Sequence, residues 1–126
     1  MAERRRVLLV DDSTTVCTVV EKILRECGFE QIEVVQDGNA ALDCMQKSAF
    51  EIILCDWEMA PISGVDVLNE VRRNPEAKKT SFILMSARKE PQWILAAKKA
   101  GADCMITKPF SAAMLKTKID QLGKRN

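Results

Sequence analysis

The sequence predicts an α/β protein in which β-strands and α-helices alternate five times along one domain. Its 126 residues suit a single domain, and its 47% apolar and 29% charged residues are typical of a folded globular chain. Short runs of consecutive apolar residues recur between amphipathic stretches. Consecutive rather than alternating apolar residues are typical of strands covered on both faces, as in a parallel sheet. The alternation predicts that helices cover both faces of that sheet.

The predicted strands come from apolar runs of three or four residues. Four runs are strong, at residues 7–10, 52–55, 82–85 and 104–106, and a weaker fifth lies at 32–35. The stretches that follow the runs are predicted to be helices because their apolar residues recur at helical spacing. In chain order, these residues are Val16, Val19, Val20, Ile23, Leu24 and Cys27; Ala40, Ala41, Cys44 and Met45; Val65, Leu68 and Val71; Ile94, Leu95 and Ala97; and Met114, Leu115, Ile119 and Leu122.

Glycine and proline mark several of the predicted helix boundaries. Gly28 is predicted to cap the end of the first helix. The second helix, at residues 39–47, follows an Asp-Gly turn at 37–38, and an Asn-Pro pair at 74–75 ends the third.

The composition excludes several classes of chemistry. The chain has no histidine, which excludes Ser-His-Asp and Cys-His catalysis, histidine-ligated metals and a histidine phosphodonor within it. Lys and Arg number 19 against 18 Asp and Glu, and the net charge of +1 argues against nucleic-acid binding through bulk positive charge. Five cysteines without a Cys-x-x-Cys pair are interpreted as buried apolar residues in a reducing compartment. The first apolar run is too short for a signal peptide or a membrane span, so we expect a soluble, cytoplasmic protein.

Polar residues follow four of the predicted strands. They are Asp11 and Asp12 after the first, Asp56 at the end of the third, Ser86 at the end of the fourth, and Lys108 after the fifth. Ligands of such sheets bind outside the carboxyl ends of the strands, so these side chains are expected to converge. Three close carboxylates require a cation or raised pKa values, and ligation by oxygen alone suits Mg²⁺. A lysine and a hydroxyl can neutralise phosphoryl oxygens, and Asp56 is the natural nucleophile for an aspartyl-phosphate.

Each of these residues also has a structural interpretation when it is taken alone. Asp12 is a candidate helix N-cap, Ser86 a candidate loop residue, and Lys108 a candidate solvated charge. The functional interpretation is favoured because the residues occur together and at the ends of strands.

Four motifs carry a resemblance to a known family over essentially the whole chain. They are Val-Asp-Asp at 10–12, Cys-Asp-Trp-Glu-Met at 55–59, Met-Ser-Ala at 85–87 and Thr-Lys-Pro-Phe at 107–110. Asp56 lies 44 residues after Asp12, 30 before Ser86 and 52 before Lys108. In order and spacing, the chain resembles the receiver domain of two-component response regulators, and in particular the single-domain kind used in chemotaxis. The resemblance implies a flavodoxin-like sheet with strand order 2-1-3-4-5 and a single receiver domain over residues 1–126, without an output domain.

The resemblance also implies a role for each site residue. Asp56 would accept a phosphoryl group from a partner's phosphohistidine, and Ser86 and Lys108 would bind the phosphoryl oxygens. The ligands of Mg²⁺ would be Asp11, Asp12, Asp56 and the backbone carbonyl of Glu58. The implied partners are a histidine kinase or histidine phosphotransfer protein as phosphodonor, and a downstream protein on the face of the fourth helix, fifth strand and fifth helix. A phosphorylation-dependent homodimer is compatible with that face, whereas nucleic acid and membrane are not expected partners.

The sequence departs from the family pattern at two places, and two further positions bear on dephosphorylation. Met105 stands where receivers usually carry an aromatic switch residue, so we expect the switch to be kept but altered. Pro61 lies one place later than usual, which predicts a local difference in its loop. Glu58 and Arg88 occupy positions that tune dephosphorylation in the family; they either form a pair over the phosphoryl site or are solvated. The Lys108–Pro109 bond is expected to be cis by the resemblance, although X-Pro bonds are trans by default.

We therefore expect a phosphorylation-activated switch, not a turnover enzyme. The main alternative is a phosphorylation-independent protein-interaction module that keeps the fold but has a vestigial acidic site. A phosphatase of the haloacid-dehalogenase kind is set aside because it requires Asp-x-Asp after the first strand, where this chain has Asp11-Asp12-Ser13.

Overall fold

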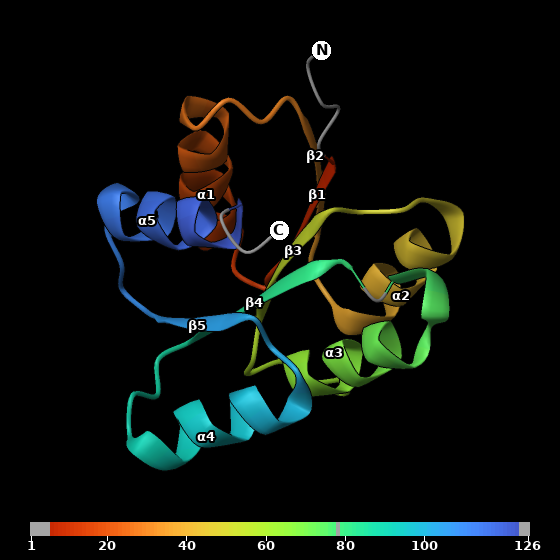
Figure 1. Cartoon of the computed structure of the whole chain (residues 1–126). Helices are drawn as coiled ribbons and strands as arrows, with labels where there is room; N and C mark the ends of the chain where they lie inside the picture. Colours follow the sequence, from red (N-terminus) through yellow and green to blue (C-terminus); the bar gives the residue numbers. More distant parts are fainter. Residues whose placement is uncertain (1–5, 78, 124–126) are drawn as a thin grey trace.

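The computed structural model describes residues 6–77 and 79–123, and in this part of the chain a five-stranded parallel sheet forms the centre (Figure 1). The strands are β1 (Arg6–Val10), β2 (Gln31–Val35), β3 (Ile52–Asp56), β4 (Ser81–Ser86) and β5 (Cys104–Thr107). Their order is β2-β1-β3-β4-β5, which confirms the predicted flavodoxin-like topology. The ends of the predicted domain, residues 1–5 and 124–126, lie outside the described residues.

Helices cover both faces of the sheet (Figure 1). They are α1 (Thr14–Glu26), α2 (Gly38–Lys47), α3 (Gly64–Arg73), α4 (Pro91–Ala100) and α5 (Ala112–Gly123), with a short 3₁₀ turn η1 (Pro75–Ala77) after α3. Alternate residues of each strand point to opposite faces, so β1 contributes Val7 and Leu9 to the core under α1 and α5. Leu8 and Val10 contribute to the second core, under α2, α3 and α4. Burial on both faces explains why the central strands β1, β3 and β4 appear in the sequence as continuous apolar runs.

The helix caps settle one of the structural alternatives. Ser13, not Asp12, is the N-cap of α1, because its side-chain Oγ accepts a hydrogen bond from the backbone N–H of Val16 at 3.2 Å. The interpretation of Asp12 as a cap is therefore wrong. Gly28 has a φ of 100° directly after the C-cap Cys27, which is the left-handed conformation expected at a helix end.

Several predicted helix faces are partly wrong. Val19 on α1, Ile94 and Leu95 on α4, and Met114 on α5 are each about half exposed. Two residues outside the predicted faces are buried instead, Cys17 on α1 and Val67 on α3. Helical spacing predicts where the apolar face of a helix lies. It does not predict how much of that face the neighbouring elements cover, so residues at the edges of the face are misassigned.

The cysteines only partly follow the prediction of burial. Cys17 and Cys55 are buried, whereas Cys27, Cys44 and Cys104 are partly exposed, and none of these five described cysteines forms a disulfide. Among the described residues, no helix is long and apolar enough to cross a membrane.

Candidate functional site

The carboxyl ends of β1, β3 and β5 bring two carboxylates and one ammonium group into direct contact. Lys108 Nζ donates hydrogen bonds to Asp11 Oδ2 at 2.8 Å and to Asp56 Oδ1 at 2.9 Å. Asp11 and Asp56 are 1% and 4% exposed, so this ion pair lies largely out of water. The other carboxylate oxygen of Asp11 accepts a hydrogen bond from the backbone N–H of Ser13 at 2.9 Å. Thus three of the predicted site residues form one connected cluster.

Backbone contacts hold this edge of the sheet in place. The N–H of Trp57 donates to the carbonyl of Met85 at 2.8 Å, and the N–H of Lys108 donates to the carbonyl of Ser86 at 2.7 Å. These bonds align the ends of β3, β4 and β5. Gly64 at the start of α3 lies against the carbonyl of Asp56, where a side chain would collide. The backbone thereby fixes where the Asp56 carboxylate emerges.

Two cis peptide bonds lie close to these strand ends. The Lys108–Pro109 bond is cis, as predicted, and the Ala60–Pro61 bond is cis as well. The second lies in the loop that was predicted to differ because Pro61 is shifted by one place.

The pKa values reflect burial and the close charges. Burial raises the pKa of the Asp56 carboxyl, and the charges of Asp11 and Glu58 act in the same direction, while Lys108 opposes them. Burial lowers the pKa of the Lys108 ammonium, but its hydrogen bonds to Asp11 and Asp56 and the charge of both carboxylates outweigh burial and raise the pKa above its ordinary value. Lys108 is therefore protonated at neutral pH.

The chemistry of the donor set fits a small divalent cation. Asp12 is exposed, and one carboxylate oxygen of each of Asp11, Asp12 and Asp56 lies within 4.8 Å of the others. Oxygens on opposite sides of Mg²⁺ are about 4.2 Å apart, so small adjustments would bring these ligands together. With the carboxylates ionised and Lys108 protonated, the cluster carries two surplus negative charges, which a divalent cation would neutralise.

Ser86 is connected to Glu58, whose side chain the sequence indicated only as a partner of Arg88. The Ser86 hydroxyl donates to Glu58 Oε2 at 2.7 Å and accepts from the backbone N–H of Arg88 at 3.0 Å. The Arg88 guanidinium lies 3.9 Å from the same Glu58 oxygen and stacks over the ring of Trp93 at 4.4 Å. Trp93 in turn meets Trp57 edge to face at 5.2 Å. The opposite charges of Glu58 and Arg88 were the signal for this group, and in the structure the two side chains approach each other while both stay exposed to solvent.

Met105, the remaining predicted residue, lies on β5 opposite Leu84 and is partly buried. It packs against the core under α4, and Thr107, two residues later, pairs with Ser86.

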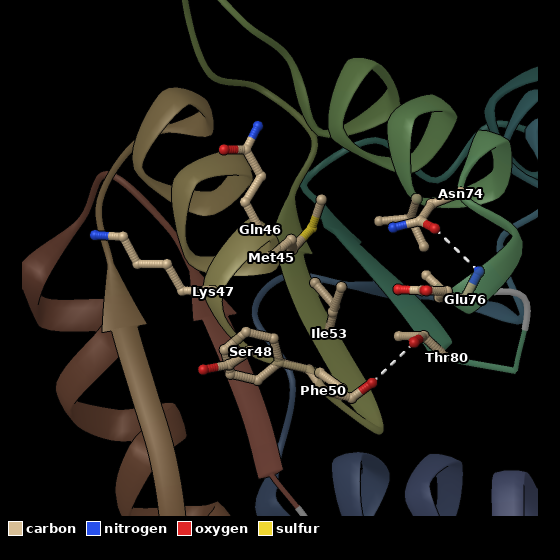
Figure 2. Close-up of a pocket in the computed structure, with 12 residues that line it drawn as sticks. Met45, Gln46, Lys47, Ser48, Phe50, Ile53, Asn74, Glu76 and Thr80 are labelled. Atoms are coloured by element: carbon tan, nitrogen blue, oxygen red, sulfur yellow. Dashed lines mark hydrogen bonds between the residues drawn. The ribbon is translucent and has the colours of Figure 1, made fainter.

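A cleft of about 250 Å³ is lined by Phe50 and Ile53 at the beginning of β3, whereas Asp56 of the acidic cluster ends that strand. Figure 2 shows the residues that line the cleft. Its lining includes Met45, Phe50 and Ile53, and Thr80 at its rim donates a hydrogen bond to the carbonyl of Phe50 at 2.8 Å. None of the predicted site residues lines it, so the cleft and the acidic site are separate features.

Comparisons with known proteins identify the family of the chain. A family model of the response regulator receiver domain matches residues 7–120. The chemotaxis protein CheY-3 of Vibrio cholerae is 34% identical over 120 residues, which cover 95% of this chain and 92% of the relative. The chemotaxis protein CheY of Pseudomonas aeruginosa is 31% identical, with 95% and 97% covered.

Solved structures agree as well. The chemotaxis response regulator CheY4 of Vibrio cholerae has a TM-score of 0.89 at 28% identity, covering 95% of this chain and 99% of that one. A second structure is the receiver domain of a sensor histidine kinase from Pseudomonas aeruginosa PAO1, which was solved with a magnesium ion coordinated in its active-site cleft. It has a TM-score of 0.85 at 24% identity and covers 96% of this chain and 99% of that one, so it supports the fold alone. This chain belongs to the response regulator receiver domain family.

Proposed function

We propose that this chain is a phosphorylation-activated switch that accepts a phosphoryl group on Asp56 from a phosphohistidine of a partner protein. The observation that carries the proposal is the contact of Lys108 Nζ with Asp56 Oδ1 at 2.9 Å, inside a buried cluster with Asp11. Phosphoryl transfer needs a nucleophile, a fixed positive charge and carboxylates that can bind a metal ion, and all three lie at this edge of the sheet.

The proposed step makes one bond and breaks one bond. A carboxylate oxygen of Asp56 attacks phosphorus, the P–O bond forms as the P–N bond breaks, and the electron pair stays on the imidazole nitrogen, which takes up a proton. We assign the binding of phosphoryl oxygens to Lys108, through its charge, and to Ser86, through its hydroxyl. Asp11, Asp12, Asp56 and the backbone carbonyl of Glu58 are the proposed Mg²⁺ ligands. When bound, Mg²⁺ would supply positive charge that lets a phosphoryl group approach these carboxylates.

The proposed partners follow from family membership. They are a histidine kinase or a histidine phosphotransfer protein as phosphodonor, and a downstream protein or a second copy of the chain on the face formed by α4, β5 and α5. Ile94 and Leu95 on α4 and Met114 on α5 are about half exposed, so two of the elements of this face carry apolar side chains that a partner could contact. Five described cysteines without a disulfide suit the reducing cytoplasm as its place of action.

The experiment is phosphorylation by a small phosphodonor, such as acetyl phosphate, with Mg²⁺. Intact-mass spectrometry should show one added phosphoryl group, and Asp56→Asn should abolish it because an amide is not an anionic nucleophile. Asp43→Asn, a matched change on the exposed surface of α2, should leave the modification intact. Modification that persists in Asp56→Asn would refute the assignment. A wild-type chain that neither binds Mg²⁺ nor becomes modified would instead favour the phosphorylation-independent interaction module.

A further inference from the structure

The hydroxyl of Ser86 is already committed to an internal acceptor. Ser86 is fully buried, and its Oγ lies 2.7 Å from Glu58 Oε2. A hydroxyl has a single O–H donor, so Ser86 can donate to Glu58 or to a phosphoryl oxygen but not to both. The acceptor is a carboxylate, which makes this hydrogen bond stronger than one to a neutral group.

We propose that the Glu58 side chain is an internal competitor of the phosphoryl group: it holds Ser86 in the unphosphorylated arrangement and must release it before Ser86 can bind a phosphoryl oxygen. This inference rests on the proposed function. It gives Glu58 a positioning role through its carboxylate, separate from the role proposed for its backbone carbonyl.

The release of Glu58 is linked to α4 through Arg88. The backbone N–H of Arg88 donates to Ser86 Oγ at 3.0 Å, and its guanidinium lies between Glu58 and the ring of Trp93. When Ser86 turns away, the freed carboxylate of Glu58 keeps Arg88 as its nearest charged partner. Movement of Arg88 toward Glu58 would loosen its stacking on Trp93, which lies in the first turn of α4 and contacts Trp57.

The test is a double-mutant cycle on the affinity for beryllofluoride, a stable substitute for the phosphoryl group, in excess Mg²⁺. The proteins are wild type, Glu58→Ala, Ser86→Ala and the double variant, titrated by backbone NMR. Glu58→Ala should bind beryllofluoride more tightly for two reasons, the loss of a negative charge and the release of Ser86. In the Ser86→Ala background only the charge effect remains, so the cycle isolates the competition.

We expect the gain in affinity from Glu58→Ala to be about threefold to tenfold larger when Ser86 is present than in the Ser86→Ala background. A hydrogen bond to a charged acceptor corresponds to about tenfold to a hundredfold, and the expected range lies at and below the lower end because the Glu58 side chain is 39% exposed. Glu33→Ala, the same charge change at an exposed position on β2, should have little effect. An equal gain in both backgrounds, or no gain, would overturn the proposal.

A second measurement uses the free protein without metal or beryllofluoride. The amide resonance of Arg88 reports on its bond to Ser86 Oγ, so it should shift in Glu58→Ala, together with the indole resonance of Trp93, and stay in place in Glu33→Ala. Unchanged resonances in Glu58→Ala would show that Glu58 does not hold Ser86. If the wild type binds no beryllofluoride, the proposed function fails, and this measurement still decides whether Glu58 controls Ser86.

Discussion

Substituting methionine for Arg72 should remove three hydrogen bonds that tie α3 to the segments before β4 and β5. The guanidinium donates to the carbonyl of Gly101 at 2.9 Å, to the carbonyl of Thr80 at 2.8 Å and to Asp103 Oδ2 at 3.0 Å. The same oxygen of Asp103 accepts from the backbone N–H of Phe82 at 2.8 Å. Arg72 therefore holds the beginnings of the two strands whose ends carry Ser86 and Lys108.

The expected loss in the free energy of unfolding is about 2–3 kcal/mol. Three net hydrogen bonds contribute about 1 kcal/mol each, and methionine keeps most of the apolar contact of the arginine stem. The side chains of Arg72 and Asp103 are 24% and 19% exposed, so water replaces part of the lost hydrogen bonding. The loss in the free energy of unfolding is therefore smaller than for breaking a fully buried ion pair. The change should act on stability rather than on chemistry.

Arg73→Met is the matched control. Arg73 is the next residue on the same helix, and its ion pair with Glu70 at 2.6 Å is largely exposed. Its loss should cost less than about 0.5 kcal/mol. Urea unfolding followed by circular dichroism measures both variants, with an unchanged dependence on urea concentration as the sign of a simple loss of stability. If Arg72→Met loses no more stability than Arg73→Met, the three hydrogen bonds do not stabilise the sheet as argued.

Three further predictions concern the site. In metal-free buffer Asp56→Asn should be more stable than wild type at neutral pH, because burial raises the pKa of Asp56 in the folded protein. As the pH falls through the raised pKa toward 3.8, the folded wild type takes up a proton before the unfolded chain does, so the stability advantage of the variant should shrink. An advantage that grows as the pH falls, measured by urea unfolding, would contradict this. Mg²⁺ should change the fluorescence of Trp57 when it is isolated by Trp93→Phe, and adding Asp12→Ala should weaken the response; no response at all would leave the proposed metal site without support. Gly64→Ala should lower the free energy of unfolding by about 2 kcal/mol, since its Cβ would collide with the carbonyl of Asp56, and wild-type stability in the same urea assay would refute that close contact.

The positions of the central strands were predictable because a strand buried on both faces consists of consecutive apolar residues. The run at residues 52–55 is continuous and apolar, and β3 is buried at every position in the centre of the sheet. The meeting of Asp11, Asp56 and Lys108 was predictable for a second reason, since parallel strands place their carboxyl ends at one edge.

Side-chain partners across loops were not predictable in the same way. Glu58 and Ser86 are 28 residues apart, and their hydrogen bond depends on side-chain rotamers and on the path of the loop after β3, which leave no periodic pattern in the sequence. The exposure of Ile94 and Leu95 was missed for a related reason: their apolar character suits a buried face, but on α4 the small side chain of Ala97 makes the buried contact.

In the free protein, the groups proposed to bind phosphoryl oxygens form hydrogen bonds with other side chains of the chain. Lys108 is paired with Asp11 and Asp56, and the hydroxyl of Ser86 is paired with Glu58. Each contact to a phosphoryl oxygen would therefore replace an internal hydrogen bond, and the stability of the phosphorylated arrangement would be the difference between the two sets. Asp11 and Asp56 are buried and the Lys108 side chain is largely buried, so a change in their hydrogen bonds also affects the stability of the fold. The Glu58 side chain, in contrast, is 39% exposed. Substitution of Glu58 is thus the change that should shift the balance between the two arrangements while leaving the core intact.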